Sequence, residues 1–424
     1  MMRRSFLVVF VFGLAGISLV TVRWSSLSDV PYGSMLPAHR ESLFAVESSL
    51  QLPVQEERLS RLRSACATNT NRYLSDRYWE ESLHQFLIDI KHNLVLCPVP
   101  KVSTSTMKRF FSILGNKNKG RSVFNISSRG IHRESKSYDN VGGVFGKETF
   151  LRKFYALNKA RKVMFVRDPY ERLFSGYVDR VFGVTEQLRP LLDIIFPAKS
   201  NSTKKAHCRL TFQDLAVYVT NRKTMQVDQH FRPAYTYCYP CHIQYDYVGK
   251  LETWRQDAKA MLTSVGADPK LFLGDEEVFD ENNELSILRD IVKRAFLMFH
   301  TKNYLSCLTR YEILKRTWVT FQVRGYLSIT TTFPLTEKEA NNVTSTQFDA
   351  LVKDAYQKVQ DHDSVRQQRQ LAMREAFYSL PRPLLLKLQV LFQPDCELFG
   401  YQCSVDVRFK ESERPKPVFN LDKV

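Results

Sequence analysis

Lys162-Val-Met-Phe-Val-Arg-Asp-Pro-Tyr-Glu-Arg-Leu-Phe-Ser-Gly-Tyr177 has the pattern of a buried strand that runs directly into a helix. Residues 162–166 are almost entirely apolar and few enough for a buried strand. Asp168 is expected to cap the helix, because its carboxylate can accept hydrogen bonds from free N–H groups, and Pro169 suits the first helical position. Glu171, three residues after the cap, predicts a capping box.

Three polar residues of this stretch are left over after capping and packing. Arg167, Arg172 and Ser175 belong neither to the cap nor to the apolar stripe of the predicted helix. An arginine and a hydroxyl beside a helix N-terminus are what a phosphate dianion requires. A phosphate site is therefore predicted here, with an ordinary solvated helix start as the alternative that this segment alone leaves open.

A second strand–turn–helix unit lies upstream. Residues 93–97 predict a short strand, which is ended by Pro98 and Pro100. The turn Lys101-Val-Ser-Thr-Ser-Thr106 then directs several N–H groups and hydroxyls towards one point, beside the mobile Lys101 ammonium. The Walker A pattern Gly-x-x-x-x-Gly-Lys-Ser/Thr is absent, so the ATPase and kinase interpretations lose their main support. A Ser/Thr-rich turn with no ligand remains the alternative.

These units predict an α/β fold with a central parallel sheet flanked by helices, in which ligands bind at the carboxyl ends of the strands. Both phosphate-like turns fall at such ends. A third unit is predicted from a strand at 245–250 and a helix from Thr253, with Gln256 as its capping partner, to Ser264. Later helices are expected over 287–299, 348–358 and 365–378.

Four blocks of the chain, in this order, resemble the Golgi carbohydrate sulfotransferases of the chondroitin 4-O-sulfotransferase and HNK-1 sulfotransferase type. The blocks are Pro100-Lys-Val-Ser-Thr-Ser-Thr-Met-Lys-Arg109, Phe165-Val-Arg-Asp-Pro-Tyr-Glu-Arg-Leu-Phe-Ser-Gly-Tyr177, Asp228-Gln-His-Phe-Arg-Pro233 running into residues 238–253, and Leu391-Phe-Gln-Pro-Asp-Cys-Glu-Leu-Phe-Gly-Tyr401. The resemblance covers residues 90–402 and implies a P-loop-NTPase-like sulfotransferase fold. One departure stands in the first block, where many relatives have Asn-Trp in place of Thr106-Met107, so the donor site is expected to pack differently there.

The resemblance also implies a donor substrate, 3′-phosphoadenosine 5′-phosphosulfate, and no metal. Its 5′-phosphosulfate would be held by Pro100, Lys101, Val102, Ser103, Thr104, Ser105 and Thr106, and its 3′-phosphate by Arg167 and Ser175. Sulfuryl transfer, like phosphoryl transfer, passes through a loose in-line transition state, so positioned cations and N–H donors carry most of the catalysis. Lys101, near the bridging oxygen, is therefore a predicted catalytic residue.

The acceptor hydroxyl needs a proton acceptor, and His230 is the candidate because imidazole is the usual base near neutral pH. Two alternatives stay open. His230 is equally well explained as a hydrogen-bonded histidine that steadies the turn before Pro233, and His132, on a predicted loop, is a second candidate base.

The N-terminal region predicts a membrane anchor. Residues 5–22, eighteen in number, are uncharged and mostly apolar, which is just enough to cross a bilayer as a helix. Arg3 and Arg4 favour a cytoplasmic N-terminus, and a cleaved signal peptide is the alternative. The predicted organisation is a cytoplasmic tail at 1–4, a transmembrane signal anchor at 5–22, a lumenal stem at 23–85, a catalytic domain at 86–405 and a flexible tail at 406–424.

Cysteines and glycosylation sequons agree with a lumenal domain. The eight cysteines predict disulfides whose pairing the sequence does not determine, and Cys97 is equally compatible with a free buried thiol. Cys238 and Cys241 have zinc-ligand spacing, but no second pair with that spacing accompanies them. Sequons begin at Asn125, Asn201 and Asn342.

The net charge of +17 indicates an anionic partner. Nucleic acid is disfavoured because the predicted anchor places the domain in the secretory lumen. Together with the predicted anchor, the resemblance implies a single-pass type II Golgi membrane enzyme that moves a sulfuryl group to a glycan, namely the 4-OH of N-acetylgalactosamine in chondroitin or dermatan chains. A homo-oligomer is compatible with the sequence. The alternative function is a non-catalytic lumenal glycan-binding protein on the same fold.

Overall fold

The computed structural model of the 424-residue chain describes residues 9–13, 16–20, 52–69, 79–118, 122–133, 138–145, 158–183, 210–274, 276–300 and 308–423. Residues 49–424 form one compact unit, and residues 1–48 form a second, separate unit. Every residue predicted to hold the donor or to accept a proton lies in the larger unit and is described.

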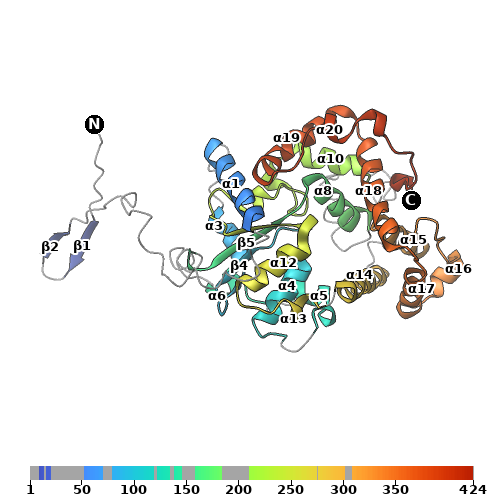
Figure 1. The fold of residues 1–424 in the computed structure, drawn as a ribbon, viewed down its shortest axis with the longest axis horizontal. Helices are drawn as coiled ribbons and strands as arrows, with labels where there is room; N and C mark the ends of the chain where they lie inside the picture. Colours follow the sequence, from blue (N-terminus) through green and yellow to red (C-terminus); the bar gives the residue numbers. More distant parts are fainter. Residues whose placement is uncertain are drawn as a thin grey trace. The chain divides into compact units, whose positions relative to one another are not determined.

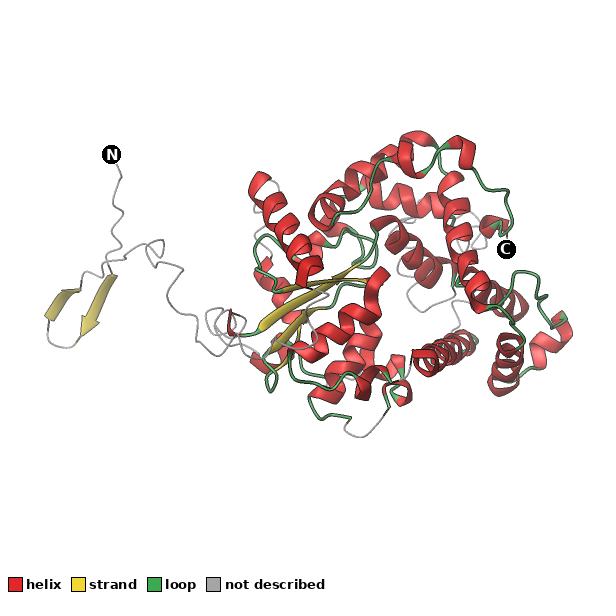
Figure 2. Cartoon of the chain, viewed as in Figure 1, coloured by secondary structure: helices red, strands yellow, loops and turns green. Residues whose placement is uncertain are grey.

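The larger unit contains a four-stranded sheet, with α1 (Leu52–Thr68), α4 (Thr104–Leu114) and α12 (Trp254–Ser264) beside it (Figure 1). Its strands, in spatial order, are β3 (Leu87–Asp89), β4 (Leu94–Cys97), β5 (Arg161–Val166) and β6 (Tyr247–Lys250). β4, β5 and β6 are parallel, and β3 runs antiparallel at the edge. The predicted central parallel sheet is confirmed, with helices on both sides of it (Figure 2).

The register of β5 against β6 depends on one glycine. Phe165 is the partner of Gly249, and the Phe165 ring lies over the glycine. A Cβ atom at position 249 would come within 2.4 Å of that ring, so any larger residue would push the two strands apart. The two strand ends, and the turns that follow them, are thereby held next to each other.

A helix follows each parallel strand. The three helices are α4 (Thr104–Leu114), α8 (Pro169–Tyr177) and α12 (Trp254–Ser264). Phe110 of α4 packs against Trp254 and against Phe272 of α13 (Lys270–Leu273). The three predicted strand–helix units are confirmed. The predicted capping box of α12 is wrong, because the Thr253 hydroxyl donates to the side chain of Asp257 at 2.6 Å instead of receiving a backbone N–H.

A helical layer covers α8 and extends the fold away from the sheet. Tyr170 of α8 packs edge-on against Phe377, Phe392 and Phe409, with ring centroids 5.2–5.5 Å apart. The helices of this part are α10 (Phe212–Asn221), α14 (Glu276–Met298), α15 (Arg310–Val323), α16 (Glu337–Asn342), α17 (Ser345–Gln357), α18 (His362–Tyr378) and α19 (Arg382–Phe399). The three later helices predicted from the sequence are present as α14, α17 and α18, and α14 begins eleven residues before its predicted start.

Short helices connect these elements. They are α3 (Trp79–Ser82), η2 (Leu83–Gln85), η3 (Val123–Asn125), α5 (Ser128–Arg133), α6 (Val141–Phe145), η4 (Val178–Phe182), η6 (Thr224–Gln226), α11 (Tyr235–Cys238), η7 (Leu251–Thr253), α20 (Val405–Arg408), η8 (Glu411–Glu413) and η9 (Leu421–Lys423). Among them, η4 is a turn of π-helix that directly continues α8. It carries residues of the candidate site.

Part of the predicted stem belongs to the folded unit. α1 (Leu52–Thr68) lies within 23–85 and packs beside β6. Gln55 exchanges two hydrogen bonds with the backbone of Val248, and Arg58 pairs with Asp257 at 2.9 Å. The folded part therefore begins before residue 86, because α1 covers the end of the sheet and pairs with a buried carboxylate.

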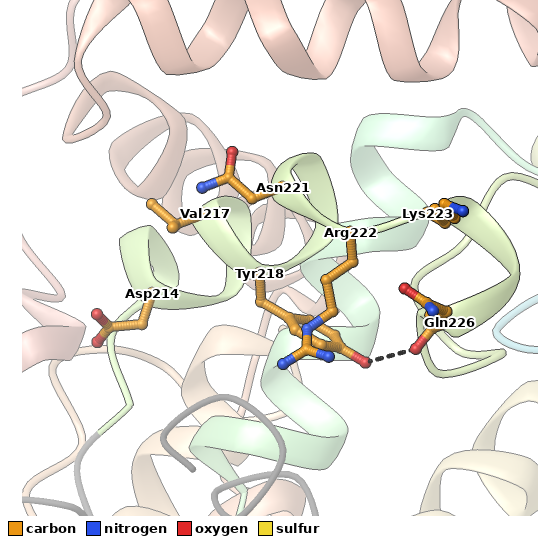
Figure 3. A pocket seen from close by; sticks show the side chains of 7 residues that line it. All are labelled: Asp214, Val217, Tyr218, Asn221, Arg222, Lys223 and Gln226. Atoms are coloured by element: carbon orange, nitrogen blue, oxygen red, sulfur yellow. Dashed lines mark hydrogen bonds between the residues drawn. The ribbon is translucent and has the colours of Figure 1, made fainter. Parts of the chain in front are cut away.

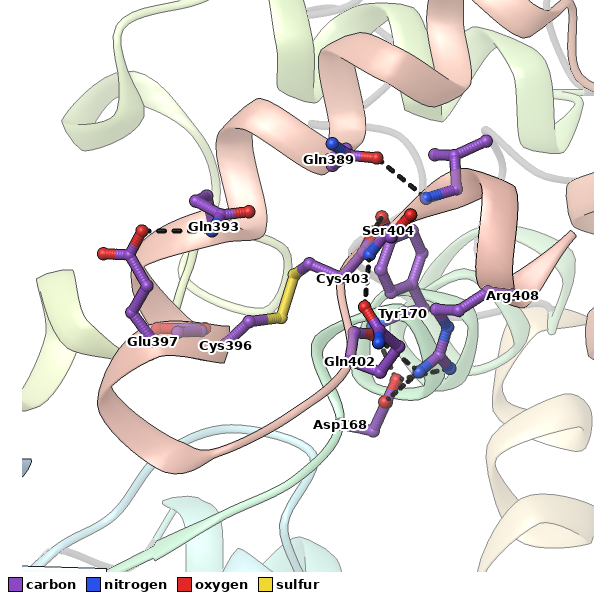
Figure 4. Close-up of a disulfide and its surroundings, with 12 residues drawn as sticks. Asp168, Tyr170, Gln389, Gln393, Cys396, Glu397, Gln402, Cys403, Ser404 and Arg408 are labelled. Atoms are coloured by element: carbon purple, nitrogen blue, oxygen red, sulfur yellow. Dashed lines mark hydrogen bonds and ion pairs between the residues drawn. A yellow bond between two sulfur atoms is a disulfide. The ribbon is translucent and has the colours of Figure 1, made fainter. Parts of the chain in front are cut away.

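The predicted flexible tail at 406–424 is instead packed onto the helices as far as it is described. Phe409 and Phe419 are buried, and Glu375 accepts hydrogen bonds from three successive backbone N–H groups at 418–420. Arg408 forms two ion-pair hydrogen bonds with Asp168, the cap of α8 (Figure 4). Aromatic burial and this buried charge pair hold the segment in place.

Among the described residues of the larger unit, three disulfides are present: Cys66–Cys241, Cys97–Cys238 and Cys396–Cys403. The Cys97 thiol is therefore not free, and Cys238 and Cys241, each bonded to another cysteine, are unable to hold zinc. Cys97 ends β4, so its bridge to α11 fixes the strand end that leads into the first phosphate-like turn. Cys208 and Cys307 lie outside the described residues.

The described residues of the predicted anchor form two strands, β1 (Val9–Gly13) and β2 (Gly16–Val20), paired antiparallel. This differs from the predicted helix. Valine, phenylalanine and isoleucine dominate the two strands, and these residues favour extended backbone. Within the described ranges, no helix combines the length and the apolar character that crossing a bilayer requires.

Candidate active site

The turn between β4 and α4 has a strained backbone. Lys101 and Ser103 both take left-handed conformations, with φ of 71° and 59°. Each such residue costs on the order of 1–3 kcal/mol, and strain of this kind concentrates where a turn must direct its N–H groups at a ligand. Thr104 steadies the turn, because its hydroxyl donates to the carbonyl of Val99. The free N–H groups of the first turn of α4 begin here.

The Lys101 ammonium is held by a carboxylate that lies just beyond α8, in the strand–helix unit of β5. Its Nζ donates to Oδ2 of Asp179 at 2.9 Å, and both side chains are largely buried. Asp179 lies in η4, immediately beyond α8, so the continued helix brings the two predicted phosphate segments together. Burial lowers the pKa of Lys101 from 10.5 to about 8, and Asp179 opposes that change.

Asp179 is shared by four cations. Besides Lys101, Arg324 lies 3.0 Å and Arg294 3.3 Å from its Oδ1, and Arg180 lies 3.7 Å from its Oδ2. Burial alone would raise the pKa of Asp179, but Lys101 and the arginines hold it well below 3.8. The carboxylate is therefore ionised at any physiological pH.

His230 lies at the edge of this cluster and has an assigned tautomer. Its Nδ1 is 2.6 Å from Oδ1 of Asp228, and its Nε2 is 2.6 Å from an Nη2 of Arg180. A carboxylate only accepts and a guanidinium only donates, so the proton is on Nδ1 and Nε2 is the acceptor. Burial lowers the pKa of His230 below 6.5, with Arg180 adding to the effect and Asp228 opposing it. His230 is thus a neutral imidazole with one basic nitrogen, as a general base requires.

His132, the second candidate base, contacts the other side of the first turn. Its Nε2 is 2.8 Å from the Ser105 hydroxyl, and its Nδ1 is 3.2 Å from Nζ of Lys108. Desolvation, Lys108 and Arg180 lower the pKa of His132 to about 3. Because lysine only donates, Nδ1 accepts and Nε2 donates to Ser105, so the acceptor nitrogen of this ring faces a cation, as Nε2 of His230 does. The low pKa makes His132 a weak proton acceptor at neutral pH.

Of the predicted 3′-phosphate residues, Arg167 lies just before α8 and Ser175 lies in its last turn. Arg167 is buried and pairs with Glu171 at 3.0 Å, and Ser175 lies half-buried one turn further along the helix. Burial lowers the pKa of Arg167, opposed by Glu171 and Glu252. The Asp168 cap is confirmed, since its carboxylate accepts from the N–H groups of residues 170 and 171. The capping box is wrong: Glu171 turns to Arg167, and the Asp168 N–H donates to Glu252.

The remaining predicted donor-site residues divide into two groups. Pro100, Val102 and Thr106 are buried, so they shape the turn, whereas Ser103 and Ser105 are partly open to solvent. Met107, where the family pattern is broken, is 1% exposed and sits in the apolar core. Its side chain therefore packs inwards and takes no part in the surface of the turn.

Four charged residues of the cluster were missed by the sequence analysis: Asp179, Arg180, Arg294 and Arg324. Asp179 falls on the same side of the helix as Ser175, which is the one local signal available. Arg294 and Arg324 come from α14 and from the end of α15, more than a hundred residues away. Arg172 is buried and donates to the carbonyls of residues 230 and 232, so its role is to hold the His230 segment.

A separate hollow of about 530 Å³ lies beside α10 and η6 (Figure 3). It is lined by Asp214, Val217, Tyr218, Asn221, Arg222, Lys223 and Gln226. None of these is a predicted site residue. In the described residues, no group of three or more His, Cys, Asp or Glu side chains is arranged to hold a metal ion.

The comparisons with known proteins agree with this geometry. The sulfotransferase family model matches residues 84–295, half of the chain. Carbohydrate sulfotransferase 12 of Mus musculus is 28% identical over 242 residues (51% of this chain, 58% of the relative), and carbohydrate sulfotransferase 9 of Homo sapiens is 27% identical over 253 residues (56% and 54%). Carbohydrate sulfotransferase 14 of Danio rerio is 29% identical over 234 residues (52% and 59%).

The chain thus spans a little more than half the length of these curated relatives. No solved structure matches it. The matched range contains both strand–turn–helix segments, the Asp179 cluster as far as Arg294, and His230. Because the family model matches half of its length, the chain belongs to the sulfotransferase family.

Proposed function

We propose that this protein is a carbohydrate O-sulfotransferase that takes its sulfuryl group from 3′-phosphoadenosine 5′-phosphosulfate. The observation that carries the proposal is the convergence of the two segments: Lys101, at a strained turn before a helix N-terminus, meets Asp179 at 2.9 Å beside a neutral His230. Family membership and the names of the relatives, all carbohydrate sulfotransferases, support the same reaction class.

The residues present suit the donor. A turn with two left-handed residues, the Lys101 ammonium and the start of α4 offer cationic and N–H contacts to a phosphosulfate. In this proposal residues 100–106 hold that group, and Arg167 with Ser175 holds the 3′-phosphate. Arg167 is oriented by Glu171, so the phosphate would share or displace that carboxylate.

When bound, the donor supplies a sulfuryl group already activated for transfer. Nε2 of His230 takes the proton of the acceptor hydroxyl, and Asp228 keeps the opposite nitrogen protonated. Lys101 stays cationic because Asp179 supports its charge, and its ammonium stabilises the negative charge that collects on the bridging oxygen.

The acceptor we propose is the 4-OH of N-acetylgalactosamine in chondroitin or dermatan chains. The resemblance of the four sequence blocks supports this choice, and the +17 net charge supports an anionic polymer. The names of the relatives specify only carbohydrates.

We further propose that the protein is a type II Golgi membrane protein with residues 5–22 as its anchor and 86–405 as the core of its lumenal domain. Three disulfides and the exposed sequon residues Asn125 and Asn342 support an oxidising lumenal compartment. Asn201, the third sequon, lies outside the described residues. Glycosidase sensitivity of Asn125→Gln and Asn342→Gln variants tests the orientation: a lumenal domain loses one glycan in each.

The test of function uses the full chain, labelled donor and desulfated chondroitin. Transfer of label that depends on Lys101 supports the proposal. Binding of 3′-phosphoadenosine 5′-phosphate, seen as a raised melting temperature, with no transfer to any glycan favours the glycan-binding alternative instead. Absence of both contradicts the donor site.

A further inference from the structure

The cluster around Asp179 contains far more positive than negative charge. Lys101, Arg180, Arg294 and Arg324 surround a single carboxylate, which gives these five side chains a formal charge of +3. Arg180 and Arg324 also lower the pKa of Lys101, and Arg180 lowers that of His230. The pKa values of Lys101 and His230 are thus both lowered by the excess of positive charge around them.

The arginines have donor capacity that the protein leaves unused. The Nε atoms of Arg180 and Arg324 are buried, and neither has a hydrogen-bond partner among the described residues, although Nε of Arg180 lies 3.7 Å from Oδ2 of Asp179 as an ion pair. A buried guanidinium nitrogen without an acceptor is costly, and each such case calls for an explanation. The side chain of Arg294 is 37% exposed, so the cluster opens to solvent on the side of α14.

The position of the cluster identifies which substrate it faces. Lys101 is on the donor side, whereas Nη2 of Arg180 lies 2.6 Å from Nε2 of His230. That nitrogen is the one that must receive the proton of the acceptor hydroxyl. Arg180 therefore blocks the basic nitrogen of His230 unless another acceptor binds its guanidinium group. The acceptor sugar must bind directly beside the arginines.

We propose that Arg180, Arg294 and Arg324 form a subsite for an anionic group on the acceptor, a carboxylate or a sulfate ester on the sugar next to the one that is sulfated. The planar guanidinium groups suit such oxyanions, which accept paired hydrogen bonds. Engagement of Arg180 by this anion would also release Nε2 of His230. An anionic acceptor would thereby free its own general base.

This inference rests on the proposed function and narrows it to acceptors that carry a charge near the reacting sugar. The carboxylate and the sulfate ester share the same oxyanion chemistry. The experiment separates them by using desulfated chondroitin, the same polymer with its carboxyl groups reduced, and carboxyl-reduced chondroitin that carries sulfate esters.

For the full-length wild-type protein, kcat/KM on desulfated chondroitin should exceed that on the carboxyl-reduced polymer by about 30-fold, the scale of one charge-assisted contact. Arg294→Gln should reduce this ratio to about threefold or less, with unchanged affinity for 3′-phosphoadenosine 5′-phosphate. Arg289→Gln is the matched control: it lies on the same helix, is 56% exposed and pairs with Asp349 instead, so the ratio should stay at the wild-type value. Recovery of activity on the sulfated, carboxyl-reduced polymer would assign the subsite to sulfate esters as well.

A second variant tests the release of the base. Arg180→Gln should raise the pKa of His230, so the acidic limb of the pH–rate profile should move to higher pH, and the preference for the charged polymer should fall. Equal kcat/KM for wild type on charged and carboxyl-reduced polymers would overturn the subsite. So would an Arg294→Gln variant that weakens donor-product binding and lowers activity on both polymers equally, because the arginines would then serve the donor.

If no polymer is sulfated although the donor product binds, the proposed function fails on its own. Direct binding then decides the subsite: weaker binding of the carboxyl-reduced polymer that disappears in Arg294→Gln supports it, and equal binding of both polymers overturns it.

Discussion

Replacing Asp179 by asparagine should change the pH dependence of turnover more than any other single substitution in the cluster. The substitution keeps the size of the side chain and removes the carboxylate that lies 2.9 Å from the Lys101 ammonium, the one ion-pair partner of Lys101 in the described part of the chain. An opposite charge at such a distance raises the pKa of a lysine by about 1–3 pH units, because it favours the charged ammonium. The pKa of Lys101, about 8 in the wild type, should therefore fall below about 7.

The sign of the effect follows from the role of Lys101 as a cation. Wild-type kcat should be lost as the pH rises through about 8, and in Asp179→Asn the same loss should occur at least one pH unit lower. The variant should also be less stable by about 3 kcal/mol, because three arginines and a lysine lose their buried partner. In the wild type, the pKa of Asp179 is depressed in the folded state. Its contribution to stability is therefore complete above pH 3.8 and is lost as the pH falls below 3.8.

The assay is kcat at saturating donor and acceptor from pH 6 to 9, with circular dichroism to confirm folding. Asp349→Asn is the control, since it removes a carboxylate from a half-exposed pair with Arg289 that does not include Lys101. A folded Asp179→Asn protein with the wild-type pH profile would refute the claim that Asp179 supports the charge of Lys101.

Three further outcomes follow from the same geometry. Arg167→Lys should weaken binding of 3′-phosphoadenosine 5′-phosphate by about tenfold or more while kcat at saturating donor changes little, because one of two paired contacts is lost; a fall in kcat with unchanged affinity would place Arg167 at the reacting group. His230→Gln should lower kcat about 10²–10⁴-fold, with the exposed His300→Gln as control. The acidic limb of the wild-type pH–rate profile should lie below pH 6.5. A fully active His230→Gln variant would show that His230 is not the general base. Arg408→Ala should lower the free energy of unfolding by about 2 kcal/mol, because the buried Asp168 loses its charged partner. If chemical denaturation shows no change, the C-terminal segment does not stabilise α8.

Local sequence signals predicted the two segments because their information is local. The apolar run at 162–166, the Asp168 cap and the Ser/Thr turn after Pro100 each act within a few residues, and the structure has β5, α8 and α4 where they indicate. The capping boxes at Glu171 and Gln256 failed because side chains four residues away compete for the same groups. A buried Arg167 draws Glu171 away, and Asp257 takes the hydroxyl of Thr253.

The Asp179 cluster was beyond sequence reasoning because it joins four elements that no short motif links. Arg294 and Arg324 lie on helices that look like ordinary charged helices when read alone. The disulfide pairing required the fold as well, since Cys97 and Cys238 are separated by 141 residues. The C-terminal segment seemed loose by composition, whereas Phe409 and Phe419 hold it through contacts that only the helical layer provides.

The most direct measurement is transfer of labelled sulfate from the phosphoadenosine donor to desulfated chondroitin, with wild type and Lys101→Ala compared side by side at saturating donor. The account predicts transfer by the wild type and a loss of at least about 100-fold in kcat for Lys101→Ala, with the variant still folded and still binding the donor product. Undiminished transfer by a folded Lys101→Ala protein would contradict the central claim that the two segments meet to form a sulfuryl-transfer site at Lys101.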